Sequence, residues 1–470
     1  MSEIALQYDQ IILDYSYLIA AILFVIGLKK TSRPDTARAG NLWSAAGMLL
    51  AMITTLFLHI DAHGQRISMI NGIVVVLVIS AGTVVGWIMA RRVRMTAMPQ
   101  MVSFYNATGG AASALVALME YSNPENSSSL VTLLGLVIGS IAFSGSMIAY
   151  GKLDGKVHDW RSPVMKFVNL LVLIAISLAV AYMLISKEPV MGKMIWLYGL
   201  FVVSLVYGIF FVMPIGGADM PVVISLLNSF TGIAAAMAGF IYGNKAMILG
   251  GILVGAAGTI LTVLMCRAMN RSLLNVIIGD FGGGPAGTAA GVAGTIKEIS
   301  LSDASILLNY TQKVVIVPGY GLAAAQAQHV CSELDKLLSE RGVEVKYAIH
   351  PVAGRMPGHM NVLLAEADVP YEKLVEMDDI NPDLPNTDVV VVIGANDVVN
   401  PAAIDDPGSP IYGMPIINAH TAKNIIVMKR GMGKGYAAIE NNLFYNDKTR
   451  MLFGNAKDTL QKLVAEIKNL

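Results

Sequence analysis

Hydrophobic residues form long continuous stretches in the first part of the chain and only short runs in the last part. Eight stretches carry no charged residue and are close to the roughly 20 apolar residues that a membrane-spanning helix needs. They occupy 40–60, 67–90, 95–119, 126–151, 167–186, 194–218, 220–244 and 246–266. A ninth stretch, 10–28, contains Asp14. The pattern predicts an α-helical membrane bundle of about nine transmembrane helices.

Beyond residue 297 the apolar runs shorten and alternate with amphipathic stretches. Runs at 313–318, 343–350, 388–394, 424–428 and 451–453 are typical of buried strands in a parallel sheet. A helical stretch follows the first run as far as about Arg341, and a last helix begins near Asn455. This alternation predicts an α/β domain with a Rossmann-like, doubly wound parallel sheet.

Composition and charge change at the same place as the hydrophobic pattern. The chain is 55% hydrophobic and 14% charged, whereas soluble domains are about 25% charged. This composition excludes a soluble enzyme and a disordered chain. Residues 1–279 hold 17 Lys and Arg against 11 Asp and Glu, and the remaining residues hold 16 against 22. We therefore expect a transmembrane domain at 1–278, a flexible linker rich in Gly and Ala at 279–297, and a soluble domain at 298–470.

Basic residues gather in the loops on one side of the predicted bundle. The loops after the first, third, fifth and ninth spans hold 13 Lys and Arg, and the loops on the other side hold four. Cytoplasmic loops are enriched in Lys and Arg. The bias places the N-terminus outside and the C-terminal domain in the cytoplasm, as in a bacterial-type inner membrane.

Three polar residues stand out in the bundle because lipid makes such groups costly. Asp219 lies between the seventh and eighth spans, Asn228 follows nine residues later, and Asn106 lies within the fourth span. Asp219 is placed to cap the eighth span, and each residue could form a hydrogen bond between helices. The alternative is a polar path for ions or protons.

A glycine-rich turn follows the first predicted strand. Gly319, Gly321 and Ala324 form a G-x-G-x-x-A pattern between a strand and a helix, which fits the dinucleotide fingerprint with Ala in the third place. The glycines let the backbone approach a pyrophosphate at a helix N-terminus. The pattern predicts a nucleotide site.

The residues after the other strands bear on which nucleotide binds. An NAD site usually carries an acid at the end of the second strand, but this strand ends at His350-Pro351. Lys429 and Arg430 close a later strand and begin a glycine-rich turn. A basic pair there suits the 2′-phosphate of NADP, although it is also compatible with a solvated turn. Neither a metal site nor a nucleophile motif is evident, and hydride transfer between two cofactors needs neither.

Several long motifs closely resemble the β subunit family of proton-translocating NAD(P) transhydrogenases over nearly the whole chain. They are GGADMPVVISLLN at 216–228, CRAMNRS at 266–272, PGYGLAAAQAQ at 318–328, HPVAGRMPGHMNVLLAEA at 350–367, GANDVVNPAA at 394–403 and KRGMGKGY at 429–436. The resemblance implies that the soluble domain binds NADP(H) in a reversed orientation. It also implies that a separate α subunit binds NAD(H), and that the enzyme is a dimer of αβ units. NADH then reduces NADP⁺ as a proton moves inward.

The resemblance also assigns residues. Gly319 and Gly321 would approach the pyrophosphate, and Lys429 and Arg430 would hold the 2′-phosphate. Asp397 would lie near the nicotinamide as the catalytic and coupling residue. The other positions expected to line the cofactor site are Tyr320, Ala324, Arg355, Gly394, Ala395, Asn396, Gly435 and Tyr436.

In the membrane domain, the resemblance assigns Asp219 and Asn228 to coupling and proton conduction. Asn106 stands where some family members have a membrane histidine. The identity of the protonated group in the path is therefore left open by the sequence. An alternative function is an ion transporter or channel whose Rossmann domain only senses nucleotide.

Overall fold

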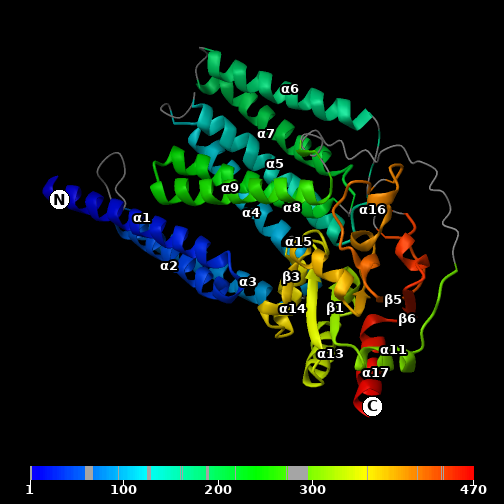
Figure 1. The fold of residues 1–470 in the computed structure, drawn as a ribbon. Helices are drawn as coiled ribbons and strands as arrows, with labels where there is room; N and C mark the ends of the chain where they lie inside the picture. The colour runs from blue at the N-terminus through cyan, green and yellow to red at the C-terminus, as the bar shows by residue number, and fades with distance from the viewer. Residues whose placement is uncertain are drawn as a thin grey trace. The chain divides into compact units, whose positions relative to one another are not determined.

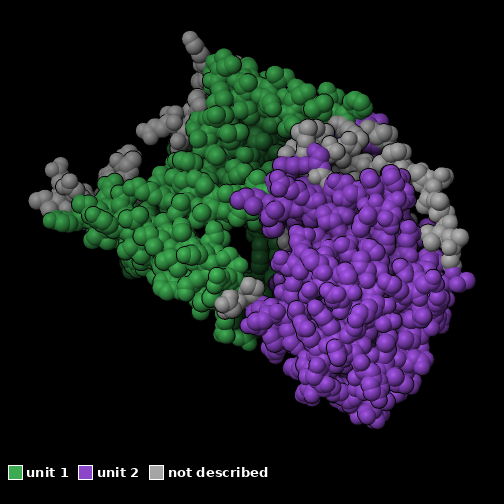
Figure 2. All heavy atoms as spheres, viewed as in Figure 1, with its two compact units in different colours: residues 1–154, 167–212, 226–259 green, residues 155–166, 213–225, 260–470 purple. Residues whose placement is uncertain are grey.

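The structure is a computed structural model of the 470-residue chain. It describes residues 3–58, 67–93, 95–123, 129–158, 160, 162, 164–186, 190–216, 219–270, 272–273, 295–356, 358–409, 411–435, 437 and 439–470. Two compact units divide the chain, as Figure 2 shows in two colours. The first comprises 1–154, 167–212 and 226–259, and the second comprises 155–166, 213–225 and 260–470.

Nine helices within the described residues are long and apolar enough to cross a membrane, which confirms the predicted α-helical bundle (Figure 1). They are α1 (Glu3–Thr31), α2 (Pro34–Leu58), α3 (Met69–Arg92), α4 (Met98–Glu120), α5 (Leu130–Leu153), α6 (Val164–Ile185), α7 (Val190–Val212), α8 (Met220–Ile241) and α9 (Lys245–Ala268).

Small residues let the helices of the first unit approach closely. A Cβ atom on Gly110 of α4 would lie 2.8 Å from the Gly139 carbonyl oxygen of α5, and a Cβ on Gly139 would lie 2.8 Å from the Gly110 oxygen. Between α8 and α9, a Cβ on Gly251 would lie 2.4 Å from the backbone nitrogen of Ala236. Backbone contact of this kind replaces the hydrophobic effect as the basis of helix packing in lipid.

The soluble part of the second unit contains a parallel sheet of six strands in the order β3-β2-β1-β4-β5-β6. The strands are β1 (Lys313–Pro318), β2 (Glu344–Ile349), β3 (Leu374–Glu376), β4 (Val389–Ile393), β5 (Asn424–Lys429) and β6 (Thr449–Phe453). This order is that of a dinucleotide-binding Rossmann sheet, so the predicted fold class is confirmed. The central strands β1 and β4 are almost wholly buried, as their unbroken apolar sequences require.

Two details of the soluble domain differ from the prediction. Strand β3 was not predicted, because it has three residues that are only partly buried or exposed. The single predicted helix after β1 is instead two helices, α12 (Tyr320–Ala324) and α13 (Gln328–Glu340). Gln326 separates them with a φ of 51°, a left-handed conformation that no helix interior accommodates.

Short helices and one long helix complete the domain. They are α11 (Leu301–Asn309), α14 (His359–Glu366), α15 (Met377–Ile380), α16 (Ala402–Asp405) and α17 (Ala456–Asn469). Asn455 caps α17 by accepting a hydrogen bond from the backbone of Lys457, which agrees with the helix start predicted near Asn455. The backbone at Lys297 already pairs with the sheet, because its carbonyl oxygen accepts from the Met451 nitrogen at 2.8 Å.

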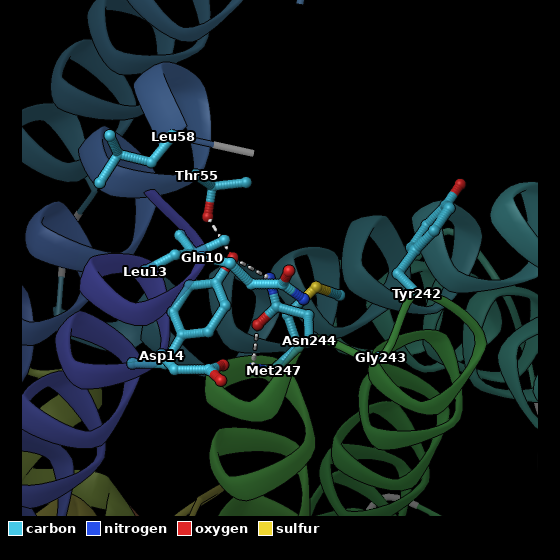
Figure 3. A pocket seen from close by; sticks show the side chains of 10 residues that line it. Gln10, Leu13, Asp14, Thr55, Leu58, Tyr242, Gly243, Asn244 and Met247 are labelled. Carbon is cyan, nitrogen blue, oxygen red and sulfur yellow. Dashed lines mark hydrogen bonds between the residues drawn. The ribbon is translucent and has the colours of Figure 1, made fainter. Parts of the chain in front are cut away.

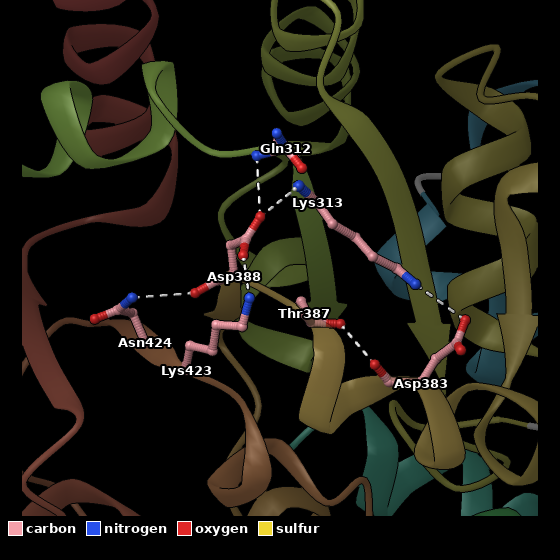
Figure 4. A network of polar contacts seen from close by, with 7 residues as sticks. All are labelled: Gln312, Lys313, Asp383, Thr387, Asp388, Lys423 and Asn424. Atoms are coloured by element: carbon pink, nitrogen blue, oxygen red, sulfur yellow. Dashed lines mark hydrogen bonds and ion pairs between the residues drawn. The ribbon is translucent and has the colours of Figure 1, made fainter.

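Charged side chains tie the amino ends of the central strands together (Figure 4). One Asp388 oxygen accepts hydrogen bonds from the backbone nitrogens of Gln312 and Lys313, both at 3.0 Å, and the other pairs with Lys423 at 2.8 Å. Lys313 also pairs with Asp383 at 3.1 Å. These contacts join the starts of β1, β4 and β5 away from the loops in which the candidate nucleotide residues lie.

Candidate functional site

The predicted nucleotide residues follow four adjacent strands. They lie directly after β2, β1, β4 and β5, which are neighbours in the sheet and run parallel. The carboxyl ends of these strands therefore form one edge. The chain changes direction across the sheet between β1 and β4, and open α/β sheets bind ligands at such a switch point. The loops after these two strands hold Gly319–Ala324 and Gly394–Asp397.

Glycine backbones from the two central loops are in direct contact. The backbone nitrogen of Gly321 donates to the Gly394 carbonyl oxygen at 3.0 Å, and that of Gly319 donates to Ile393 at 2.9 Å. A Cβ atom on Gly394 would lie 2.4 Å from the Cα of Gly321. Gly394 also has a φ of 67°, which side chains disfavour. The glycines are thus required for contact between the loops as well as being suited to approach a phosphate.

A stacked group of side chains lies beside this contact. The Arg355 guanidinium carbon is 4.2 Å from the centre of the Tyr320 ring, a distance at which cation–π attraction operates. The Tyr320 ring meets His359 edge-on at 6.2 Å between centroids. His359 Nδ1 accepts a hydrogen bond from the Arg355 backbone at 3.0 Å, which fixes the loop after β2. The structure therefore brings Tyr320 and Arg355 together.

His350 and His359, which bracket this loop, are both buried and uncharged near neutral pH. Burial lowers the pKa of His350 to about 4 and that of His359 to about 4, the latter helped by the positive charge of Arg355. His350 Nε2 lies 2.9 Å from the Pro415 carbonyl oxygen, and its Nδ1 accepts from Val352 at 3.2 Å. The end of β2 thus carries a neutral imidazole in the place where an NAD site usually has an acid.

Asp397 lies at the start of the segment after β4 and holds the loop after β5. Its Oδ2 atom accepts a hydrogen bond from the backbone nitrogen of Ala437 at 3.0 Å. A Cβ on Gly435 would lie 2.3 Å from Asp397 Oδ1 and 2.7 Å from Asn396 Nδ2, so a side chain there would displace these two polar groups. Asn441 Nδ2 donates to both the backbone and side-chain oxygens of Asn396, at 2.9 and 3.0 Å.

The basic pair at the end of β5 divides into one half-buried and one exposed residue. The Lys429 ammonium lies 4.6 Å from the centre of the Phe444 ring and donates to the Gly433 carbonyl oxygen. Burial lowers the pKa of Lys429, and the negative charge of Asp397 opposes that shift. Arg430 is exposed. A small cavity of about 70 Å³ adjoins Lys429, Asn396 and Asn441.

The polar membrane residues fall on α4 and α8. Asp219 is buried and immediately precedes α8, and its backbone oxygen accepts from Val223. Asn228 is partly buried in the same helix. Asn106 is buried within α4, which continues through it without a break. Thr231 of α8 donates to the Asn106 carbonyl oxygen at 3.1 Å, which links the two helices in the first unit.

Comparisons with known proteins cover nearly the whole chain. The family model for the NAD(P) transhydrogenase beta subunit matches residues 13–466. The NAD(P) transhydrogenase subunit beta of Rhodospirillum rubrum is 44% identical over 467 residues, which span 96% of this chain and 97% of that protein. The same values hold for the subunit from a named strain of that species. The chain belongs to the NAD(P) transhydrogenase beta subunit family.

The site also contains residues that the sequence did not predict. Asn441 and Phe444 contact Asn396 and Lys429, but they lie on a 3₁₀ turn (Asn442–Tyr445) and its N-cap, which carry no motif. His359 lies within the motif at 350–367 but was not assigned a role from the sequence. Its role in fixing the Arg355 loop depends on the tertiary contact. Lys434 lies in a quoted motif and lines the small cavity.

Of the remaining predicted residues, two are described and others lie outside the described residues. Ala324 is exposed at the end of α12, and Ala395 is buried. Tyr436 and the linker residues 279–294 lie outside the described residues of the chain. Within the described ranges, no group of three or more His, Cys, Asp or Glu is placed to hold a metal ion.

Proposed function

We propose that this chain is the NADP(H)-binding, proton-conducting subunit of a membrane transhydrogenase. In this proposal, hydride passes from NADH on a partner alpha subunit to NADP⁺ on this chain while a proton moves inward. The observation that carries the proposal is the gathering of four motif loops at the carboxyl edge of a Rossmann sheet, within a chain that also holds a membrane bundle. Both parts are needed if nucleotide chemistry is to be coupled to proton movement.

The residues at the carboxyl edge fit an NADP(H) nucleotide on charge and shape. Lys429, Arg430 and Lys434 supply three cations within six residues, enough for a 2′-phosphate and a pyrophosphate. The neutral His350 at the end of β2 presents no acid that would repel a 2′-phosphate. Bound NADP(H) would supply the nicotinamide that accepts or donates hydride. The negative charge of Asp397 acts on Lys429, and its hydrogen bond to Ala437 joins it to the loop after β5. Asp397 is therefore placed to respond when a nucleotide binds at the site.

Buried polar atoms along two membrane helices support a proton path. Five side-chain atoms on or directly beside α4 and α5 are buried without a hydrogen-bond partner in the described chain: Gln100 Oε1, Asn106 Nδ2, Tyr121 OH, Thr132 Oγ1 and Ser146 Oγ. An unpaired polar atom is costly in an apolar interior unless water reaches it. We infer that water enters along this helix pair, with Asn106 within it and Asn228 on the neighbouring α8.

Coupling is proposed to run through α8, because Asp219 at its start and Asn228 within it lie on one helix. The transmembrane domain is taken as 1–278 and the soluble domain as 298–470, with 279–297 as the tether between them. The N-terminus is placed outside and the soluble domain in the cytoplasm. The active assembly is proposed to be a dimer of αβ units.

The membrane potential gives the proposal a quantitative test. One charge moving inward gains about 2.3 kcal/mol per 100 mV, which corresponds to roughly a 40-fold displacement of the nucleotide ratio. Proteoliposomes should contain the full chain with its alpha subunit, and the steady-state NADPH/NADP⁺ ratio should be measured at a fixed potential. At a potential of about 100 mV, the ratio should fall roughly 40-fold when an uncoupler is added.

Variants separate the proton path from the nucleotide site. Asn106→Ala should reduce proton pumping strongly, whereas Thr108→Ala should not, because Thr108 is exposed two residues away on the same helix. Calorimetric NADPH affinity should be unchanged in both variants. A nucleotide ratio that ignores the uncoupler while turnover continues would exclude proton coupling. Binding without any hydride transfer would leave a nucleotide sensor instead.

A further inference from the structure

A cavity of about 330 Å³ lies in the membrane unit, far along the sequence from every residue of the proposed nucleotide site (Figure 3). It is enclosed by α1, the end of α2, and the turn between α8 and α9. Its lining consists of Gln10, Leu13, Asp14, Tyr17, Thr55, Leu58, Tyr242, Gly243, Asn244 and Met247. Because the lining comes from the N-terminal half of α1, the last turn of α2, the turn between α8 and α9, and the first turn of α9, we expect the cavity to open near one membrane surface.

Opposite charges lie at the cavity. Lys245 Nζ is 2.8 Å from Asp14 Oδ1, and their side chains are 64% and 51% exposed. An ion pair this exposed contributes only about 0–1 kcal/mol. A ligand phosphate could therefore replace Asp14 as the partner of Lys245, and a ligand ammonium could replace Lys245 as the partner of Asp14, at little cost in free energy. The pair suits a ligand that carries a phosphate and an ammonium a few atoms apart.

A fixed hydrogen-bond chain forms the floor of the cavity. Thr55 donates to the Ala51 carbonyl oxygen at 2.6 Å, so the 2.8 Å bond between Tyr17 and Thr55 must use the Tyr17 proton. Asn244 Nδ2 donates to Tyr17 at 3.1 Å. The chain ends on a backbone carbonyl, which cannot pass a proton onward. This geometry favours binding over proton conduction.

The surroundings match the headgroup region of a lipid bilayer. Tyr8, Tyr15 and Tyr242 are at least half exposed at this end of the bundle, as in the aromatic belts of membrane interfaces. Leu18, Ile22 and Val25 follow Asp14 on the same side of α1 and are also at least half exposed. An acyl chain can lie along them while its headgroup enters the cavity.

We propose that this cavity binds the headgroup of a zwitterionic phospholipid, with the phosphate at Lys245 and the ammonium at Asp14. The lipid holds α1 and α2 against the turn between α8 and α9. The site is independent of the nucleotide site, so its test does not depend on hydride transfer.

Native mass spectrometry of the full chain with its alpha subunit tests the proposal directly. The complex is equilibrated with an equimolar mixture of phosphatidylethanolamine and phosphatidylglycerol, which differ in the ammonium group. The unmodified chain should retain one phosphatidylethanolamine in preference. Asp14→Asn and Lys245→Ala should each lower the affinity for that lipid by up to about fivefold, as expected for the loss of one exposed ion pair. Asp14→Asn should also shift selection toward phosphatidylglycerol.

Two further variants keep the result interpretable. Lys245→Arg should retain the lipid, and Lys30→Ala should have no effect, because Lys30 lies at the opposite end of α1 over Trp43. Equal retention of both lipids by the unmodified chain, or unchanged selectivity in Asp14→Asn, would overturn the proposal. Retention of neither lipid would overturn it as well, as would a cross-link that places an alpha-subunit helix in the cavity.

Discussion

The two edges of the parallel sheet are held together by different means. At the amino edge, Asp388 joins the starts of three strands through two backbone hydrogen bonds and an ion pair with Lys423. At the carboxyl edge, Gly321 and Gly394 bring two loops together by backbone contact alone. The contact between the two central loops at the carboxyl edge is made by backbone, whereas side chains join the strand starts at the amino edge. Side chains also fix the outer loops of the carboxyl edge, through Asp397 and His359.

The carboxyl edge also carries polar and aromatic side chains that a bound ligand could contact. Tyr320, Arg355, Asp397 and Lys429 are half-buried there, and they project from loops whose positions the glycines fix. The amino edge has charged groups as well, but Asp388 and Lys423 neutralise each other. The hydrogen bond from Lys423 lowers the pKa of Asp388, helped by the backbone hydrogen bonds from Gln312 and Lys313, so this carboxylate remains ionised as a structural group. The comparison predicts that substitutions at the amino edge change stability without changing nucleotide binding.

The largest stability effect is expected at the glycine contact. In Gly394→Ala the new methyl group would meet Gly321 at 2.4 Å, and the φ of 67° would be strained. Overpacking and left-handed strain together should lower the free energy of unfolding of the soluble domain by about 3 kcal/mol or more. Hydrogen exchange of the β1 amides in the full chain measures this loss.

Gly431→Ala is the matched control for this substitution. A Cβ on Gly431 has open space around it. The free energy of unfolding measured from exchange of the β1 amides should therefore change by less than about 1 kcal/mol. Equal protection in the two variants would mean that the loops are not held by the glycine contact.

At the amino edge, Asp388→Ala is expected to be the next most destabilising. It leaves the backbone nitrogens of Gln312 and Lys313 without their acceptor, which should cost about 2–3 kcal/mol. Lys423→Ala should cost less than about 1 kcal/mol, because its ion pair is largely exposed. Calorimetric NADPH affinity should be unchanged in both variants. A large loss of NADPH affinity in Asp388→Ala would show that the amino edge also contributes to nucleotide binding.

Mild acid should weaken the domain through its two buried histidines. Their pKa values of about 4 lie below the usual 6.5, so the unfolded chain binds protons that the folded chain excludes. Stability is therefore full above pH 6.5 and is lost as the pH falls toward 4. At pH 5 the loss should be about 2 kcal/mol for each histidine. In His359→Gln, the loss in β1 amide protection between pH 7 and pH 5 should be smaller by that amount.

The smallest effect concerns Asp397. Asp397→Asn retains an oxygen that can accept from Ala437, so stability should change by less than about 1 kcal/mol. Because the Asp397 charge raises the pKa of Lys429, its removal should lower that pKa further. NMR titration of ¹³C-methylated lysines in the full chain measures the shift. An unchanged pKa of Lys429 would show that the two groups are not electrostatically linked.

Much of the fold follows from hydrophobic patterning. Helices that cross lipid need about 20 apolar residues, so the nine spans are evident in the sequence. The five apolar strands are evident for the same reason, because a central parallel strand is buried on both faces. Strand β3 has no such pattern, since its three residues are not fully buried. The break at Gln326 carries no Gly or Pro that would mark the end of a helix in the sequence.

The candidate site was predictable only where a motif marks it. The turns after β1, β4 and β5 carry glycines or paired charges, and these are the residues that the fold collects at the carboxyl edge. Asn441 and Phe444 come from a short 3₁₀ turn whose contacts with Asn396 and Lys429 arise only on folding. The unpaired polar atoms of α4 and α5 were also beyond prediction, because burial and hydrogen bonding depend on which helices pack together.

The most direct test of the account is nucleotide selectivity at the carboxyl edge. Calorimetry should compare NADPH and NADH binding to the full chain, to a Lys429→Ala/Arg430→Ala double variant, and to the Lys423→Ala control at the amino edge. Two charge-assisted contacts to a 2′-phosphate should give NADPH an advantage of about 100-fold or more. The account predicts that the double variant loses most of this advantage and that the control keeps it. Equal affinity of the unmodified chain for NADH and NADPH, or full selectivity in the double variant, would contradict it.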